Sequence, residues 1–307
     1  FRNRGIHLTI DELRKLSWDR RIKILGDFSR MREFKPFVRD GFGIPYIPGT
    51  SIKGVIRTAL LYNVLKDFKR SNERRFQEMI EERISQIIDS DAKRANKKRL
   101  FQLVNQGWLE GFILEDKRNS PNTDWLRMLH LSDAYPGDVI ETVLISTNIL
   151  KKENGWTYKK ESTGQNTLVW VECIPENTVL EFEAFWDKGL LDDFKRNNPN
   201  VKLPDSLFKL FNTVNIWAKD VVEFEKAFSE GYDLSRWYKT NSINFRIGFG
   251  SGMISTTIAM LLSETLRKKV RNYGGFDRGN DIAPKSRRVW LRNNFPVPFG
   301  WAVLEVV

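Results

Sequence analysis

The chain has 307 residues, 41% hydrophobic and 12% aromatic, which is enough apolar material for one large domain or two ordinary ones. Its 50 lysines and arginines exceed its 39 acidic residues by 11, and a net charge of +11 favours a polyanionic partner such as nucleic acid. A single cysteine, two histidines and no run of about 18 apolar residues exclude an internal disulfide, a cysteine-rich zinc site and a membrane span, so we expect a cytoplasmic protein.

The first third of the chain is predicted to be mainly helical. Apolar residues at helical spacing favour a helix over residues 8–34. Glycine and proline then punctuate residues 40–51, and this turn-rich stretch leads into a helix from about 52 to 68. Residues 69–103 are dense in charge but carry isoleucines at helical intervals, which predicts a further helical segment.

Strand-like segments appear from residue 126 onward and alternate with helical ones. Residues 142–149 and 168–174 predict a long hairpin with a basic, glycine-bearing tip. The other predicted strands cover 126–131, 179–186, 243–247, 287–291 and 301–307, and the predicted helical stretches lie within 187–238 and at 254–270. Strands interspersed with helices in this way are typical of an α+β fold.

The first candidate site is the turn and helix start at residues 47–57. Thr50 or Ser51 can serve as N-cap, and Lys53 follows close to the positive end of the helix dipole, with Arg57 one turn later. A bound phosphate would resolve this unfavourable placement of cations, with the amides between Gly49 and Gly54 as donors. The alternative is an ordinary proline–glycine turn with Lys53 in water. The order of lysine and glycine differs from that of a nucleotide-binding P-loop.

The second candidate site is a glycine cluster that ends a predicted strand and opens a helix. Its residues are Arg246, Gly248, Gly250, Ser251 and Gly252. Alternating glycines let a backbone approach a ligand closely, and the serine adds a hydroxyl. The spacing G-x-G-x-G differs from that of dinucleotide-binding loops, and tight packing for structural reasons is the competing interpretation.

The third candidate site is the basic entry to a late strand, with Lys285, Arg287 and Arg288 followed by Trp290. These cations can contact phosphates and the tryptophan can stack on a base, although a core tryptophan beside surface cations is an equal alternative. Catalytic signals are poor, because His130 and Asp133 lie three residues apart in a strand and therefore point to opposite faces. We assign no catalytic residue, metal site or cofactor.

The segment Pro48-Gly49-Thr50-Ser51-Ile52-Lys53-Gly54-Val55-Ile56-Arg57 resembles the P-G-[ST]-[ST]-[IL]-K-G-x-[IL]-R signature of the RAMP superfamily of CRISPR proteins. Three further motifs, Leu131-Ser132-Asp133, Arg246–Met253 and the ending with 284–288 and 298–301, are similar to those of the fifth-subunit family of the Csm complex, the type III-A effector. Together the motifs extend over residues 36–307.

The resemblance implies a ferredoxin-like (RRM-like) core with a helical insertion at about 67–104 and an inserted hairpin at about 140–174. In such proteins a hairpin of this kind kinks the guide and target duplex, a role that we carry over by position only. The chain lacks the opening strand and T-P-x-H-x-G motif of the family, so we expect one decorated unit over 1–307 that is incomplete at its N-terminus. Two halves, 1–175 and 176–307, are the alternative division.

The resemblance further implies a non-catalytic subunit near the 3′ end of the guide RNA in an antiviral ribonucleoprotein. Its partners would be guide and target RNA, other subunits of the effector complex, and host nucleases that trim the guide. Protein contacts to the RNA backbone suit a complex in which base pairing selects the sequence. Lys53→Glu is predicted to weaken RNA binding or assembly. The rivals are a guide-processing endoribonuclease that depends on His130 and a nucleotide-binding regulator that uses residues 248–252.

Overall fold

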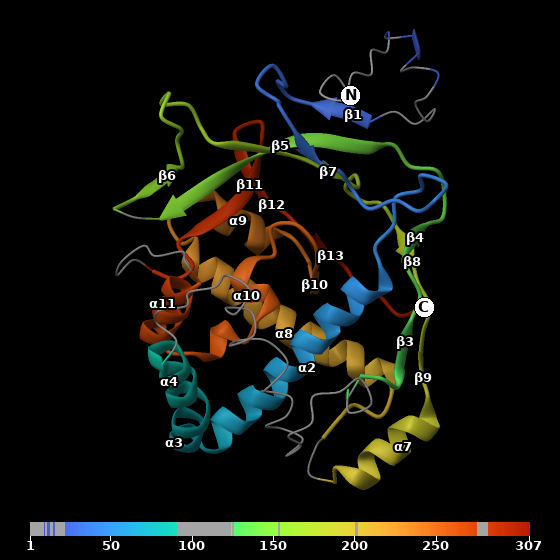
Figure 1. Ribbon diagram of the computed structural model, residues 1–307, viewed down its shortest axis with the longest axis vertical. Coiled ribbons are helices and arrows are strands. Elements are labelled where there is room, and N and C mark those ends of the chain that lie inside the picture. The colour runs from blue at the N-terminus through green and yellow to red at the C-terminus, as the bar shows by residue number, and fades with distance from the viewer. Residues whose placement is uncertain are drawn as a thin grey trace.

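The structure is a computed structural model, and Figure 1 shows its arrangement. It describes residues 9, 11, 12, 15, 22–90, 124, 126–152, 154–199, 202–274 and 282–307. Helices and strands are mixed along the chain, which confirms the prediction at that level. The end of the helical segment predicted over 69–103, from residue 91 onward, lies outside the described residues.

A seven-stranded mixed sheet occupies one end of the molecule, at the top of Figure 1. Its strands are β1 (Ile22–Leu25), β2 (Phe34–Lys35), β5 (Thr142–Lys152), β6 (Trp156–Tyr158), β7 (Leu168–Cys173), β11 (Ser286–Arg292) and β12 (Phe295–Pro298). The strand β5 is central, because β7 and β11 both pair with it antiparallel and β1 pairs with it parallel. The strand β2 extends the sheet by pairing parallel with β7.

The strands predicted over 142–149 and 168–174 pair antiparallel as expected, with Ser146 opposite Trp170. They lie in the middle of the main sheet rather than at its edge. The strand β5 continues beyond β7 and pairs there with β6, so that Lys151 lies opposite Thr157. The predicted tip is therefore itself a paired strand end.

The described residues also form three two-stranded sheets. They pair β3 (Leu129–Leu131) with β9 (Ala184–Trp186), β4 (Tyr135–Pro136) with β8 (Leu180–Glu181), and β10 (Phe245–Arg246) with β13 (Trp301–Ala302). The single strand predicted over 179–186 is thus two short strands with different partners. The partner strands β3 and β4 are separate as well, because Ala134 between them bridges with Ile47 instead. A single strand was predicted over 301–307, but the observed strand β13 comprises only the first two of these residues.

Within the described residues, the helical elements with defined bounds are α2 (Gly49–Ser71), α3 (Glu73–Phe76), η2 (Gln77–Glu81), α4 (Glu82–Ser90), α7 (Lys188–Asn197), α8 (Leu207–Phe228), α9 (Asp233–Thr240), α10 (Gly252–Thr256), η4 (Ala259–Leu261) and α11 (Glu264–Tyr273). Several begin with a side-chain cap that satisfies an orphan N–H group. Ser206 accepts a hydrogen bond from Lys209 N at the start of α8, and Asp187 accepts one from Leu190 N at the start of α7.

Two helix predictions are wrong in the described residues. Residues 22–34 are not helical, because Ile22 and Ile24 belong to a strand that pairs with 142–145, and β-branched residues suit that pairing. The helix predicted over 254–270 is divided. Thr257 Oγ1 accepts the Ala259 N–H at 3.1 Å, and Ser263 then caps a new helix. Local hydroxyl bonds here compete with the continuing helix.

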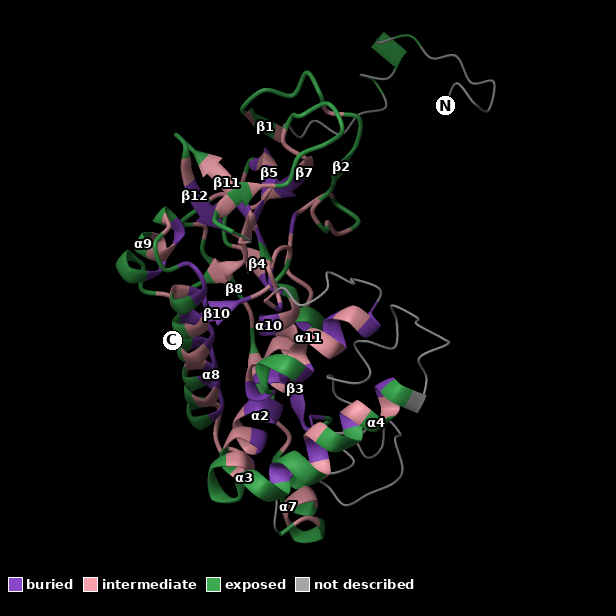
Figure 2. Cartoon of the chain, turned by 90° about the vertical axis from the view of Figure 1, so that its left-hand side faces the viewer, coloured by how far each residue is buried: buried purple, intermediate pink, exposed green. Residues whose placement is uncertain are grey.

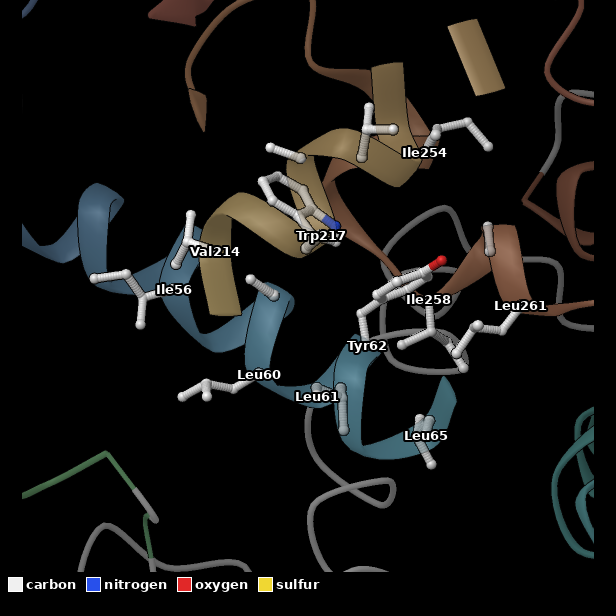
Figure 3. Close-up of a cluster of buried hydrophobic side chains, with 14 of the residues drawn as sticks. Ile56, Leu60, Leu61, Tyr62, Leu65, Val214, Trp217, Ile254, Ile258 and Leu261 are labelled. Atoms are coloured by element: carbon white, nitrogen blue, oxygen red, sulfur yellow. The ribbon is translucent and has the colours of Figure 1, made fainter. Parts of the chain in front are cut away.

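The hydrophobic core lies between α2 and α8 and is closed by α10 and η4. In Figure 3 the Trp217 indole of α8 lies among side chains of these elements, near Val214 and Ile254. This cluster draws residues from Ile52 to Tyr273, on both sides of residue 175. Figure 2 shows α2 largely buried, whereas α3 and α4 keep exposed faces. The division of the chain into two halves stays a prediction.

Candidate nucleic-acid interface

The start of α2 is capped by a residue that lies 84 positions later in the chain. Pro48 occupies the N-cap position and offers no side-chain hydrogen bond, while Asp133 Oδ1 accepts the Gly49 N–H at 2.7 Å. The predicted N-caps Thr50 and Ser51 lie inside the helix with exposed side chains, so that prediction is wrong. A carboxylate therefore already provides the negative charge that the helix dipole favours at this end.

Position 49 requires glycine because the backbone of residues 131–132 packs closely against it. A Cβ at this position would lie 2.5 Å from Ser132 O and 2.8 Å from Leu131 O. The motif Leu131-Ser132-Asp133 thus packs its backbone on α2 while its carboxylate caps the helix. Gly54 differs, since a Cβ there would meet nothing within 4 Å.

Both cations of the first candidate site have partners within the protein. Lys53 Nζ donates to Leu129 O at 2.8 Å, and Arg57 Nη2 lies 2.7 Å from both carboxylate oxygens of Asp124. Burial lowers the pKa of the Lys53 ammonium, the Asp124 carboxylate opposes that shift and the Arg57 charge adds to it. These contacts join α2 to residues 124–133. A phosphate contact at Lys53 stays a prediction.

The second candidate site is a glycine loop that leads from β10 into the first residue of α10, and we define it as residues 248–252. All three of its glycines have positive φ, at 81° for Gly248, 86° for Gly250 and 65° for Gly252. L side chains rarely adopt this backbone conformation, which accounts for the repeated glycine. Gly248 and Gly252 are exposed, while Ser251 is buried and its hydroxyl donates to Gly248 O at 2.7 Å.

Beneath this loop lies a buried ion cluster. Glu225 on α8 is 1% exposed, and it pairs with Arg246 at 3.0 Å and with Arg287 at 2.6 Å, using one carboxylate oxygen for each. Burial alone would raise the pKa of Glu225, but the charges of Arg287 and Arg246 hold it below its ordinary value. The two arginines are 2% and 7% exposed, so the structure gives them an internal role, and the phosphate contact expected from the sequence stays a prediction.

Arg288 lies on the opposite face of β11 from Arg287, as the alternation along a strand requires. Its guanidinium lies 5.4 Å from the ring centroid of Phe249, which places a cation directly against the glycine loop. Partial burial lowers the pKa of the Arg288 guanidinium, although arginine stays charged at neutral pH. Lys285 lies in the turn before β11, where its carbonyl accepts the Lys152 N–H. The second and third candidate sites therefore meet in space.

Two residues of these joined sites, Phe249 and the buried Glu225, were not singled out from the sequence. Phe249 supports Arg288, and its ring contacts Phe299 edge-on at a centroid distance of 5.8 Å. Glu225 carries a charge on a helix face that otherwise consists of buried apolar residues such as Val221 and Phe228. An acidic residue within an apolar helical stripe is the signal that would have found it.

His130 and Asp133 have separate contacts. The imidazole of His130 stacks on Phe185 with ring centroids 4.6 Å apart, whereas Asp133 caps α2. In the part of the chain that the structure describes, no group of three or more histidine, cysteine or acidic side chains is arranged to hold a metal ion. No helix among the described residues combines the length and apolar character needed to cross a membrane.

Comparison with protein families matches residues 24–230 to the RAMP superfamily. A protein of Methanocaldococcus jannaschii named CRISPR system Cms protein Csm5 is 21% identical over 294 residues, which cover 85% of this chain and 63% of that protein. A protein of the same name from Streptococcus thermophilus is 46% identical over 48 residues, 13% of each chain. The chain therefore spans less than two thirds of the length of these relatives.

Among solved structures, a chain in the cryo-EM structure of a type III-A Csm–crRNA–target RNA ternary complex has a TM-score of 0.63 and 23% identity. The likeness covers 92% of this chain and 79% of that one. The crystal structure of Csm5 from T. onnurineus gives a TM-score of 0.50 and 20% identity, covering 80% and 72% of the two chains. These likenesses concern the fold.

Proposed function

Because the chain belongs to the RAMP superfamily, we propose that it is a non-catalytic, RNA-binding subunit of a type III-A CRISPR effector complex. The observation that carries the proposal is the likeness over 85% of the chain to a protein named Csm5. The likeness of fold to a chain of a Csm–crRNA–target RNA complex and the net charge of +11 support it. Its partners in this proposal are guide RNA, target RNA and neighbouring subunits.

The finer architecture belongs to the same proposal. A ferredoxin-like core would carry the helical segment α3–η2–α4 as an insertion, and the β5–β7 region would supply the hairpin. The position near the 3′ end of the guide and the recruitment of trimming nucleases are further parts of it. Crosslinking of the assembled complex through a photoreactive group at the guide 3′ end would test that position.

The RNA contact that we propose is centred on the glycine loop and Arg288. Gly248 and Gly252 are exposed and lack side chains that would keep a phosphate at a distance. Arg288 adds a positive charge beside Phe249. Lys285 and the exposed Thr50 and Ser51, with Gly54 and Lys53, are secondary candidates on the remaining surface. Such contacts to the backbone position an RNA without reading its bases.

The absence of catalysis is also a proposal, and the contacts of the two best acid–base candidates support it. His130 stacks on an aromatic ring and Asp133 caps a helix, so the structure does not pair them as a base and its orienting group. Cleavage of guide precursor by the isolated chain that disappears in His130→Ala would establish the endoribonuclease instead.

Incubation of the purified chain with labelled guide RNA at two salt concentrations tests the proposal. We expect binding that weakens steeply as salt increases, because phosphate contacts release counterions, and RNA that stays intact on the same gel. The assay is repeated with partner subunits, since an assembly subunit can require them. Absence of binding in both forms would contradict the proposal, and saturable binding of ATP that RNA does not displace would favour a nucleotide-binding regulator.

A further inference from the structure

The ion cluster formed by Glu225, Arg246 and Arg287 joins three elements that are distant in sequence. Glu225 comes from α8, Arg246 from β10 and Arg287 from β11. Each arginine binds a different oxygen of the same carboxylate, at 3.0 and 2.6 Å. The carboxylate thus sets the distance between the end of β10 and the start of β11.

Both arginines donate further hydrogen bonds, Arg246 into the glycine loop and Arg287 to the backbone at the entry to β11. Arg246 Nη2 donates to Gly250 O at 3.0 Å, in the middle of the loop, and Nη1 donates to Ser255 Oγ in α10 at 3.1 Å. Arg287 Nη1 donates to Pro284 O at 3.2 Å and to Ser286 O at 3.0 Å, in the turn that leads into β11. The loop and the strand entry are therefore held by one network.

Aromatic rings enclose the two guanidinium groups. Arg287 lies 3.7 Å above the ring of Phe228, and Arg246 lies 4.8 Å from the ring of Trp301. Arg246 Nε and Arg287 Nη2 are buried and have no hydrogen-bond partner in the described part of the protein. Two cations against one anion also leave a surplus positive charge beneath the loop.

Stability alone does not account for such a cluster. Burial removes three charges from water, and well-packed apolar residues of similar volume often stabilise a protein as well or better. What the ions add is geometry, since charged hydrogen bonds fix direction as well as distance. Here the fixed geometry is that of the glycine loop relative to Arg288, which follows Arg287 directly in the chain and contacts Phe249 within the loop.

We propose that Glu225 is a positioning residue for RNA binding, which acts through Arg246 and Arg287 to hold the glycine loop and Arg288 in one geometry for a phosphate. This inference rests on the proposed function and adds to it a residue that does not touch the RNA. In this proposal the two buried arginines also contribute to RNA binding without contacting the RNA.

The test separates positioning from stability by replacing the whole cluster. In the full chain, the triple variant Glu225→Leu, Arg246→Met, Arg287→Met is compared with the single variant Glu225→Gln and with the wild type. Stability is followed by denaturant unfolding, and affinity is measured with labelled guide RNA at two salt concentrations. Removing one partner leaves buried charge unpaired, whereas removing all three leaves an apolar core.

We expect the triple variant to unfold near the wild-type denaturant concentration and to bind RNA at least tenfold more weakly. Wild-type affinity in the triple variant would overturn the inference. Wild-type protein that binds no RNA, either alone or with partner subunits, would instead refute the proposed function, so the two failures are distinct. Should the triple variant not fold, amide hydrogen exchange of residues 244–256 in Glu225→Gln decides. We expect the amides of residues 244–256 to exchange faster in Glu225→Gln than in the wild type, and bound RNA to slow their exchange less. Exchange equal to that of the wild type would overturn the proposal.

Discussion

Single residues at the start of α2 show how the signature segment is used structurally. Gly49 lies where the carbonyl groups of Leu131 and Ser132 pack against the first turn of α2. Asp133, from the same segment, accepts a hydrogen bond from the Gly49 N–H and so caps that turn. Lys53 and Arg57 extend the contact by binding Leu129 O and Asp124. The segment therefore fastens the helix to the β3–β4 region.

Gly49→Ala is expected to lower the free energy of unfolding by about 1–3 kcal/mol, because the added methyl group overpacks against two backbone carbonyls. Denaturant unfolding followed by circular dichroism measures the change. Gly54→Ala is the matched control in the same helix. It has open space and should stabilise by about 0.5–1 kcal/mol, because alanine is the better helix former. Equal effects of the two substitutions would refute the close-packing argument.

At the scale of elements, two connections determine how β11 is placed. Its C-terminal end turns back into β12 through Asn293 and Asn294, which both have positive φ, at 50° and 65°. Asparagine tolerates this conformation and is typical of tight hairpin turns. Its N-terminal end is held by the pairing of Arg287 with Glu225.

Asn294→Val is expected to destabilise the protein by about 1–2 kcal/mol, because a β-branched residue is strained in the left-handed region. Asn294→Gly should leave the stability nearly unchanged, since glycine adopts that region readily. Thermal unfolding of both variants measures the difference. A valine variant as stable as the glycine variant would contradict the assigned turn.

The ion pair between Arg287 and Glu225, at the N-terminal end of β11, should contribute to stability in a pH-dependent way. The folded-state pKa of Glu225 is lowered, so its stabilising contribution is fully present above the unfolded pKa of about 4.3 and is lost as pH falls through the folded value. Glu225→Gln should therefore be about 3 kcal/mol less stable than the wild type at pH 7, with a gap that narrows below about pH 4. Unfolding at a series of pH values measures the gap. A gap of constant size would show that the charge is not responsible.

At the scale of the whole molecule, internal pairing divides the basic residues into two groups. Some of them neutralise buried or half-buried carboxylates, as Arg246, Arg287 and Arg57 do. Arg288 beside the glycine loop differs from these: it is half-buried, its guanidinium lies against Phe249, and in the described structure its buried Nη1 has no hydrogen-bond partner. The count of basic residues therefore overestimates the number of positive charges that can contact RNA.

Arg288→Ala is expected to weaken binding of single-stranded guide RNA and to reduce the slope of log affinity against log salt by about 0.7, the value for one phosphate contact. Filter binding at several salt concentrations measures both quantities. Arg196→Ala removes the same charge from α7, where the side chain is 75% exposed and paired with Asp193, and should change neither. An equal change in both variants would assign the effect to net charge instead of to a contact at Arg288.

The sequence by itself determined the features that depend on nearby residues. Apolar periodicity located α2 and the paired strands β5 and β7, and helical stretches were expected within 187–238, where α7, α8 and α9 lie. The segment from Pro48 to Arg57 indicated the superfamily that the family comparison then matched. Periodicity misjudged short pieces such as β1, where alternating isoleucines fit either a helix or a strand until a partner strand is known. It also missed β12, although two adjacent asparagines are a turn signal.

Only the tertiary structure decided which cations are available to a ligand. Arg287 and Arg288 are neighbours with the same charge, yet one is buried against Glu225, 62 positions away in sequence, and the other lies against Phe249. Likewise Asp133 caps a helix that begins 84 residues before it. Helix and strand preferences arise from contacts within a few residues, whereas ion pairing and burial arise from chain segments that only packing brings together.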